Sequence, residues 1–309
     1  MDTLSKIILI AGATASGKSS FAVKLAKKIN GEIINADSMQ VYKELKILTA
    51  RPSIKKQKKI KHHLYGFQPV KKKFSTGLWL KLAIKEIKNI QKKNKIPIVV
   101  GGTGLYFKAL TDGLAKIPNI PLKTRLQIRN IHKTIGQKNF YKKLIKIDSH
   151  SKNRINPNDT QRMIRAYEIK KYTKTSLFEW FKKTKPIFKK DKFIKIYIDF
   201  PRVQLINRIS RRVEEMIKMG AISEVKTYLK LKVRKENSSN KVIGVQEISE
   251  LIKKKINLDQ AKERISIKSR QYAKRQSTWA RRYMSDWNKI DLNNVNISNL
   301  KKFFYNYLL

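Results

Sequence analysis

The 309-residue sequence contains no cysteine, and it has few acidic residues. Without cysteine, a disulfide framework, a thiolate metal site and a thiol nucleophile are excluded, which fits a reducing compartment. No run of about eighteen apolar residues occurs, so we expect no membrane-spanning helix. The predicted first strand lies close to the N-terminus, and the charged and apolar regions of a signal peptide are absent from the sequence before it. Together these absences predict a cytoplasmic protein. Hydrophobic residues still make up 41% of the chain, enough for one or two domains with a sizeable core.

Negative charge is scarce, because 22 Asp and Glu face 71 Lys and Arg, giving a formal net charge of +49. The electrostatic field of such a positive charge favours polyanionic partners, and RNA or DNA is the natural candidate. A general bias toward lysine, as an AT-rich genome produces, explains part of the excess, since lysine is also abundant on ordinary surface helices such as 81–95. Charge alone therefore does not establish nucleic-acid binding, and clustered arginines are the better indicator.

The stretch GATASGKS at 12–19 follows a short apolar run and precedes an amphipathic helical pattern. It matches the phosphate-binding loop G-x-x-x-x-G-K-[ST], in which glycines let backbone N–H groups and a helix N-terminus face an anion. The pattern predicts that Lys18 contacts a terminal phosphate and that the Ser19 hydroxyl binds Mg²⁺. The predicted diphosphate-binding positions are Gly12, Ala13, Thr14, Ala15, Ser16, Gly17, Lys18 and Ser19.

Further apolar strands at 31–38 and from 96 onward alternate with helical stretches, which predicts an α/β fold with a parallel sheet and helices on both faces. Ligands of such sheets bind at the carboxyl ends of the strands. From 113 to 190 the periodicity is helical, and strand character returns at 192–200 before helices dominate to the end. We therefore expect a P-loop NTPase-like core in two parts, 1–112 and 191–309, separated by a helical insertion at 113–190.

Two strand ends carry groups with open interpretations. Asp37 either accepts a proton or binds Mg²⁺ through water, or it is an Asx cap on the turn. The glycine-rich turn at 101–104 either brings the backbone close to a ligand, with Thr103 as a hydrogen-bond donor, or is a tight turn that needs positive φ. We favour the second interpretation.

The histidine pair at 62–63 is too isolated for a metal site, and we interpret both histidines as structural or surface residues.

Arginine clusters occur on two predicted helices. The helix that begins at Asp159 or Thr160 places Gln161 and Arg165 on one face with Arg162 adjacent, suited to phosphates or base edges unless it is merely a solvated face. In 198–216, Arg208 and Arg212 lie one turn apart and are suited to clamp a diphosphate.

The last long helix carries a basic stripe, and aromatic residues are interleaved with it. Its members are Arg270, Lys274, Ser277 and Arg281, flanked by Arg275 and Arg282. A basic stripe with aromatics is typical of a surface that binds single-stranded nucleic acid.

Taken together, these segments resemble the tRNA dimethylallyltransferase family, the isopentenyltransferases that modify the adenosine next to the anticodon. The similarity runs in order over nearly the whole chain. It is carried by GATASGKSS, INADSMQVYKELKILTARPS, HHL, VVGGTGLYFKAL, INPNDTQRMIRAYEI, RISRRVEEM, VIGVQE and QYAKRQSTWARR.

The resemblance implies that the loop holds the diphosphate of dimethylallyl diphosphate, and that the dimethylallyl group is transferred to N6 of a flipped-out adenosine. Lys18, Mg²⁺ on Ser19 and an arginine, Arg208 or Arg212, would stabilise the leaving group. Asp37 would take the proton of the amine, and Thr103 would position base and diphosphate.

The resemblance also implies that the insertion grips the anticodon stem-loop of tRNA. The expected partners are this RNA and dimethylallyl diphosphate, with no membrane and with a monomer as the working assumption. Contacts to tRNA are expected from Asp37, Ser38, Met39, Gln40, Thr103, Arg125, Gln161, Arg162, Met163, Ile164, Arg165, Lys241, Val242, Ile243, Gly244, Val245, Gln246 and Glu247, and the basic stripe adds Arg270, Lys274 and Arg275.

Three positions depart from the family pattern: Ala13 stands where proline is usual, Leu48 where glycine is usual, and Val245 where tyrosine is usual. The change at 245 removes any stacking or hydroxyl interaction there. The alternatives are a P-loop kinase or ATPase with Asp199 on Mg²⁺, a prenyltransferase of free adenine nucleotides, and an RNA-binding module without enzymatic activity.

Overall fold

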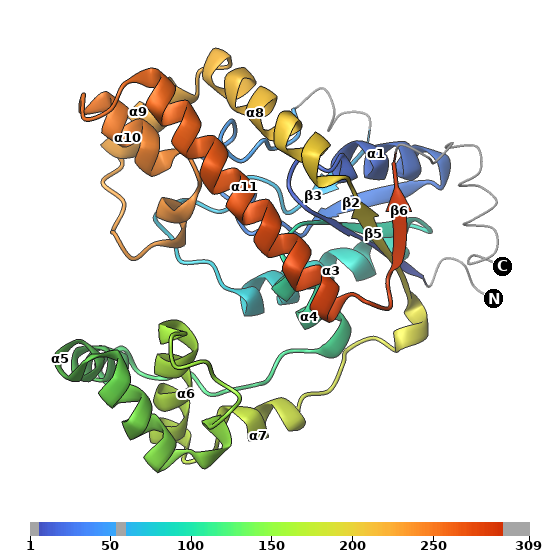
Figure 1. Ribbon diagram of the computed structural model, residues 1–309. Coiled ribbons are helices and arrows are strands. Elements are labelled where there is room, and N and C mark those ends of the chain that lie inside the picture. Colours follow the sequence, from blue (N-terminus) through green and yellow to red (C-terminus); the bar gives the residue numbers. More distant parts are fainter. Residues whose placement is uncertain (1–5, 54–59, 293–309) are drawn as a thin grey trace. The chain divides into compact units, whose positions relative to one another are not determined.

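A computed structural model describes residues 6–53 and 60–292 (Figure 1). The chain divides into two compact units, one formed by residues up to 111 together with those from 188 onward, and one formed by 112–187. We call them the core unit and the insertion unit. Within the described ranges, no helix is both long and apolar enough to cross a membrane.

The core unit contains one sheet, in which six strands of the described chain run parallel in the order β3-β2-β4-β1-β5-β6. These strands are β1 (Ile7–Gly12), β2 (Gly31–Asn35), β3 (His62–His63), β4 (Ile96–Gly101), β5 (Phe193–Asp199) and β6 (Asn288–Asp291). The predicted parallel α/β fold is confirmed. Because all strands share one direction, the phosphate loop after β1 and the turns after β2 and β4 lie at the same edge.

Helices cover both faces of this sheet. They are α1 (Lys18–Lys28), α3 (Thr76–Gln91), α4 (Gly104–Asp112) and the end of α11 (Leu258–Tyr283). Ile8 and Ile10 of β1 pack with α1 on one face, whereas Ile7 and Leu9 pack with α3 and α4 on the other. Because both faces are buried, the strand reads as a continuous apolar run rather than an alternating one.

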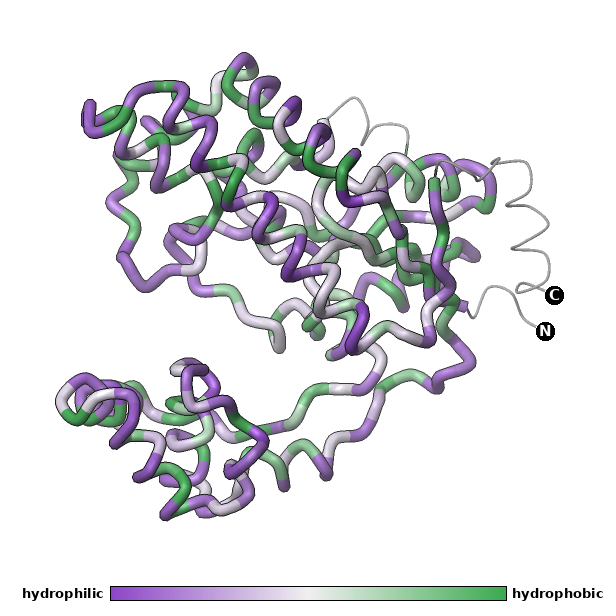
Figure 2. Tube along the Cα trace, in the orientation of Figure 1, coloured by the Kyte–Doolittle hydropathy of each residue, from purple (hydrophilic) through white to green (hydrophobic). Residues whose placement is uncertain are grey.

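Helices α8 (Arg202–Lys218) and α10 (Val245–Ile252) pack against α11, and α9 (Ala221–Lys230) packs against α8 and α10. In α8 the buried residues recur every three or four positions, and Figure 2 shows the resulting alternation of hydrophobic and hydrophilic residues along the helix. They are Leu205, Ile209, Val213 and Met216.

Two edge strands were not predicted. The sequence of β6, NKID, buries only Ile290 and has no strand-like apolar pattern. Strand β3 has two residues, and side-chain contacts hold it: His63 Nε2 lies 2.7 Å from Glu32 Oε2, and His63 Nδ1 lies 2.9 Å from Glu86 Oε2. Both strands therefore depend on partners that are remote in sequence.

The insertion unit is helical, with α5 (Leu122–Ile147), α6 (Thr160–Thr173) and α7 (Leu177–Lys182). At Gly136 the backbone leaves helical geometry, with φ of 74°, and kinks α5. Phe140 and Leu144 of α5 pack with Met163 and Tyr167 of α6 in a separate apolar core. The unit thus has its own core.

Candidate active site

The phosphate loop joins β1 to α1. Gly17 adopts a left-handed conformation, with φ of 90°, at the N-cap of α1. The Nζ of Lys18 turns back and donates to the carbonyl oxygen of Ala13 at 3.0 Å. Backbone N–H groups in the first turn of a helix have no intrahelical acceptor and can bind an anion. The predicted loop thus ends in a helix N-terminus that can receive a phosphate.

Two side chains hold Thr14 at the tip of this loop. Its N–H donates to Gln276 Oε1 at 2.8 Å, and its Oγ1 accepts from Arg212 Nη1 at 3.0 Å. The Nε2 of Gln276 also donates to the carbonyl oxygen of Gly102 at 2.9 Å. Gln276 of α11 therefore bridges the phosphate loop and the glycine-rich turn, and the motif QYAKRQSTWARR was the only sequence signal for it.

Asp37 lies in the turn that follows β2. The Asn35 side chain fixes this turn, since its Oδ1 accepts from Asp37 N–H at 2.9 Å and its Nδ2 donates to the Asp37 carbonyl oxygen at 3.0 Å. Asp37 Oδ1 accepts from Met39 N–H at 2.9 Å, and the same residue lines a cavity. The carboxylate therefore makes an Asx-type contact and also faces the site.

Thr103 is tied to the turn that carries Asp37. Its Oγ1 accepts from Ser38 N–H at 2.9 Å, and its N–H donates to the carbonyl oxygen of Ala36 at 3.1 Å. A Cβ atom on Gly101 would lie 2.1 Å from the Ala36 backbone, and one on Gly102 would lie 2.1 Å from Gln276 Nε2. Neither glycine has positive φ. The expectation of a turn that needs positive φ is wrong, because these glycines instead allow close packing against the protein.

A cavity of about 310 Å³ joins these elements. Thr14, Asp37 and Arg212 line it, together with Tyr272 and Arg275 of α11. Its apolar wall comes from Leu48, Ile209, Val213, Met216 and Ile265. The tip of the phosphate loop, a carboxylate that can accept a proton and an apolar wall therefore border the same cavity.

The charges around this cavity influence one another. Burial lowers the pKa of Lys18 to about 8, while the charge of Asp37 opposes the shift and that of Arg212 adds to it. Burial also lowers the pKa of Arg212, again opposed by Asp37. Burial raises the pKa of Tyr272, and the charge of Asp37 raises it further, so its hydroxyl stays protonated.

Both arginines of the predicted clamp reach the phosphate loop. Arg212 contacts Thr14 as described above. The Arg208 guanidinium lies 3.9 Å from the centroid of the Phe200 ring, and its Nη1 would lie 3.5 Å from a Cβ atom on Gly17. Arg212 is therefore beside the tip of the loop, and Arg208 is beside the start of α1.

The residues expected to contact tRNA have different environments in the core unit. Lys241, Val242 and Ile243 line the cavity with Arg275, and Met39 lies there too. Ser38 and Gln40 are half-buried, and Gln246 is exposed. Arg270 and Lys274 do not line this cavity but line a second groove.

Several residues expected to touch RNA are buried and offer little surface to it. Gly244, Val245 and Glu247 are buried at the start of α10, where the Glu247 carboxylate accepts from Gly244 N–H at 2.8 Å. In the insertion unit Met163 is fully buried. A helix face of period 3.6 turns one side inward, so a consecutive run of residues cannot all contact a ligand.

The other predicted residues of the insertion unit are accessible. Gln161 and Arg162 are exposed, and Ile164 is half-buried. Arg165 is half-buried, with Nη1 3.5 Å from Glu168 Oε2. Arg125 donates from Nη2 to Asn119 Oδ1 at 3.3 Å. Asp159 is the N-cap of α6, accepting from Arg162 N–H at 3.1 Å.

A phosphate loop after β1, with a carboxylate and a threonine at the neighbouring strand ends, defines a P-loop-like α/β protein. The sequence model of the IPP transferase family matches residues 40–283. The chain belongs to this family of transferases.

Similar proteins carry names of the same activity. A tRNA dimethylallyltransferase of Pelagibacter ubique (strain HTCC1062) is 62% identical, over 94% of this chain and 93% of the relative. The crystal structure of the full-length tRNA isopentenylpyrophosphate transferase from Bacillus halodurans matches with a TM-score of 0.71 at 31% identity, over 98% of this chain and 97% of the other. A eukaryotic dimethylallyltransferase described as acting on tRNA matches with a TM-score of 0.84 at 29% identity, over 97% of this chain and 80% of the other.

Proposed function

We propose that the protein transfers the dimethylallyl group of dimethylallyl diphosphate to N6 of the adenosine 3′-adjacent to the anticodon of tRNA. The products are N6-dimethylallyladenosine and diphosphate. The observation that carries this proposal is one cavity that places Asp37 and an apolar wall beside the tip of a phosphate loop. The names of similar proteins support the same reaction.

The reaction breaks the bond between the allylic carbon and the diphosphate oxygen and forms a bond from that carbon to N6. Lys18, the loop amides and Arg208 or Arg212 stabilise the negative charge that grows on the leaving diphosphate. Asp37 accepts the proton that N6 loses. Thr103, held by Ser38 and Ala36, positions the base relative to the diphosphate. The apolar wall holds the five-carbon group and keeps water away from the electrophilic carbon.

We assign Mg²⁺ to the Ser19 hydroxyl. The described residues contain no cluster of three His, Asp or Glu side chains that would hold a metal. Mg²⁺ is often bound by few protein groups together with substrate phosphates and waters, and the exposed Ser19 at the start of α1 fits that mode. When bound, the ion supplies charge neutralisation on the diphosphate. The Ser16 hydroxyl, buried without a partner in the described chain, fits a loop that gains a hydrogen bond when phosphate binds.

The proposed tRNA contacts are those of the expected residues that are accessible or line the cavity. In the core unit they are Asp37, Ser38, Met39, Gln40, Thr103, Lys241, Val242, Ile243, Gln246 and Arg275; in the insertion unit they are Arg125, Gln161, Arg162, Ile164 and Arg165. We infer that the insertion unit grips the anticodon stem-loop while the target base is flipped into the cavity. We further propose that the enzyme acts as a monomer in the cytoplasm.

The test uses purified protein, Mg²⁺, labelled dimethylallyl diphosphate and an anticodon stem-loop with three adenosines running through the target position. We expect label in the RNA, and its loss when the target adenosine is replaced by guanosine. Labelled ATP and free AMP serve as controls for the alternative reactions. Phosphate release or transfer from ATP without prenylated RNA would support a kinase or ATPase, and prenylation of AMP alone would make the free nucleotide the acceptor.

A further inference from the structure

The loop between β2 and β3 contributes Leu48 to the wall of the cavity beside the phosphate loop. Leu48 lines this cavity and belongs to the same apolar cluster as Val213 and Met216 of α8. Only 6% of its surface is exposed. It is also a position at which the sequence departs from the family pattern, with leucine where glycine is usual. The proposed reaction has so far given this side chain no role of its own.

Helix α8 orders the cavity from the phosphate loop toward Leu48. At one end Arg212 Nη1 donates to Thr14 Oγ1 at the tip of the loop, at 3.0 Å. Met216 lies four residues further along the same helix, which corresponds to about 6 Å or roughly one turn. Because Leu48 packs in the cluster of Met216, its wall lies about one helical turn from the phosphate end.

The backbone of Leu48 is held by a residue that is remote in sequence. The Glu224 carboxylate of α9 accepts three consecutive N–H groups: Oε1 accepts from Lys46 and Ile47, each at 2.7 Å, and Oε2 accepts from Leu48 at 3.0 Å. Hydrogen bonds to a charged acceptor are the stronger ones in proteins. Glu224 therefore fixes the position from which the Leu48 side chain enters the wall.

The side chain of Leu48 has no space behind it. A Cβ atom on Gly244 would lie 2.6 Å from Leu48 Cδ2, so the leucine already fills the space beside this glycine. A side chain that is fixed at its backbone and packed from behind cannot retreat from a ligand without displacing its neighbours. Leu48 thus forms a rigid part of the wall.

The proposed donor lies between the phosphate loop and this wall. Its diphosphate is at the loop and its allylic carbon faces Asp37, so the remaining carbons point toward the apolar residues. A dimethylallyl group is short enough to lie within one helical turn. A geranyl group has twice as many carbons in line, and forcing extra carbons into rigid apolar packing is unfavourable.

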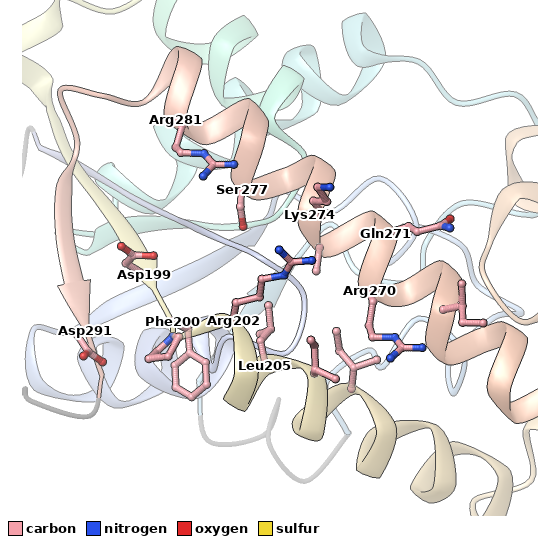
Figure 3. A pocket seen from close by; sticks show the side chains of 15 residues that line it. Asp199, Phe200, Arg202, Leu205, Arg270, Gln271, Lys274, Ser277, Arg281 and Asp291 are labelled. Atoms are coloured by element: carbon pink, nitrogen blue, oxygen red, sulfur yellow. The ribbon is translucent and has the colours of Figure 1, made fainter.

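The second groove is a poor route for a longer chain. Ile209 lines both spaces, but the groove is also lined by charged side chains, among them Arg202, Arg270 and Lys274 (Figure 3). Covering hydrated charges with hydrocarbon costs free energy. The extra carbons of a longer donor would therefore be directed at Leu48.

Resting on the proposed function, we propose that Leu48 is a specificity-determining residue that limits the transferred group to one five-carbon unit. Glu224 is the positioning residue that holds it. Donors with a longer isoprenoid chain, geranyl diphosphate first, are rejected because their additional carbons meet Leu48. Leu48 takes no part in breaking the bond to diphosphate or in removing the proton from N6.

The test uses the graded variants Leu48→Val, Leu48→Ala and Leu48→Gly. The matched control is Leu205→Ala, since Leu205 is 7% exposed but lines the second groove instead of the cavity (Figure 3). Each protein receives equal amounts of geranyl and dimethylallyl diphosphates with the anticodon stem-loop. The ratio of the two prenylated products gives the ratio of the kcat/KM values. Because both donors compete for the same enzyme molecules, this ratio does not depend on how much of a variant is folded.

We expect the ratio of geranyl to dimethylallyl transfer to rise from Leu48→Val through Leu48→Ala to Leu48→Gly, reaching about 10- to 100-fold above wild type in the last. Glu224→Ala frees the three N–H groups and should raise the ratio by a smaller factor. Glu224→Gln keeps an oxygen acceptor and should lie between Glu224→Ala and wild type. Leu205→Ala should keep the wild-type ratio whatever its total rate.

Three results would overturn the proposal. An unchanged ratio in Leu48 variants that still transfer the dimethylallyl group would remove the leucine from the donor site. An equal rise in Leu205→Ala would make general loosening of the protein the cause, and a raised KM for the stem-loop with an unchanged ratio would place Leu48 beside the base. If wild-type protein transfers neither donor, the proposed function fails, and the Kd values of the two diphosphates without RNA still decide whether Leu48 limits chain length.

Discussion

The core unit and the insertion unit hold the side chains of their proposed sites in different ways. In the core unit, the hydrogen bond from Thr14 N–H to Gln276 Oε1 joins residues 262 positions apart. In the insertion unit, Asp159 caps the N–H of Arg162, and Arg165 approaches Glu168, within one helical turn. The first arrangement fixes atoms relative to one another, as chemistry requires. The second leaves charged groups on a helix surface, where each adds to RNA affinity separately.

The largest effect is expected in the core unit at Asp37. Asp37→Ala and Asp37→Asn should each lower kcat for prenyl transfer by about 10² to 10⁴-fold, the usual contribution of a general base, while tRNA affinity changes little. Asparagine keeps an acceptor for Met39 N–H, so it separates proton transfer from the shape of the turn. Single-turnover transfer and filter binding measure the two quantities. Normal turnover in Asp37→Asn would discard the base assignment.

The second-largest effect is expected at Lys18. Lys18→Ala should lower kcat/KM for dimethylallyl diphosphate by about 10- to 100-fold, because a charge-assisted hydrogen bond is worth about 1.5–3 kcal/mol. In the wild type, the Lys18 pKa of about 8 means that the ammonium is charged below that pH and neutral above it. Diphosphate binding without RNA should therefore weaken as pH rises through about 8.

The matched variant for this pH dependence is Lys18→Arg, which keeps its charge at high pH and should bind diphosphate with no decline in that range. An unaltered kcat/KM in Lys18→Ala, or a decline that persists in Lys18→Arg, would count against the assignment of this lysine.

Variants of Gln276 test whether catalysis depends on the two hydrogen bonds by which this residue joins the phosphate loop to the glycine-rich turn. Gln276→Ala removes two hydrogen bonds of about 1 kcal/mol each, so we expect a loss of about 30-fold in kcat/KM for the diphosphate. Gln276→Glu keeps the acceptor for Thr14 N–H but places a carboxylate oxygen against the Gly102 carbonyl. It should retain a KM for the diphosphate near that of the wild type while kcat falls. Equal behaviour of both variants would argue against two separable hydrogen bonds.

The smallest effect is expected in the insertion unit. Arg165→Ala should weaken tRNA binding by about fivefold, corresponding to about 1 kcal/mol, and reduce the salt slope by about one, with no change in the KM for the diphosphate. Arg165→Lys should retain most of the affinity, since it keeps the charge. A raised KM for the diphosphate with normal tRNA binding would show that this helix is misinterpreted and would remove the contrast between the two units.

The sequence predicted those parts of the fold that depend on local pattern. Strands β1, β2, β4 and β5 are apolar runs, and helices α8 to α11 have a period near 3.6, so both could be located without knowing their partners. The strand ends at Asp37 and Thr103 followed, because parallel strands direct their loops to one edge.

The rest depends on interactions between residues far apart in sequence. Strand β3 is held by Glu32 and Glu86, and β6 pairs with β5 although Ile290 is its only apolar residue. The glycines at 101 and 102 serve close approach to Ala36 and Gln276 rather than a positive φ. Local propensity contains no information on such pairs.

Helix α11 has a further consequence, which concerns insertions and deletions rather than substitutions. Tyr272 and Arg275 line the cavity beside the phosphate loop, whereas Arg270 and Lys274 line a second groove, all within two turns of one helix. Adding or removing one residue upstream of them turns every later side chain by about 100°. Cavity-lining and groove-lining side chains would then be displaced together. We therefore expect the residue count between Ala261 and Gln276 to be far less tolerant of change than the identity of its exposed residues.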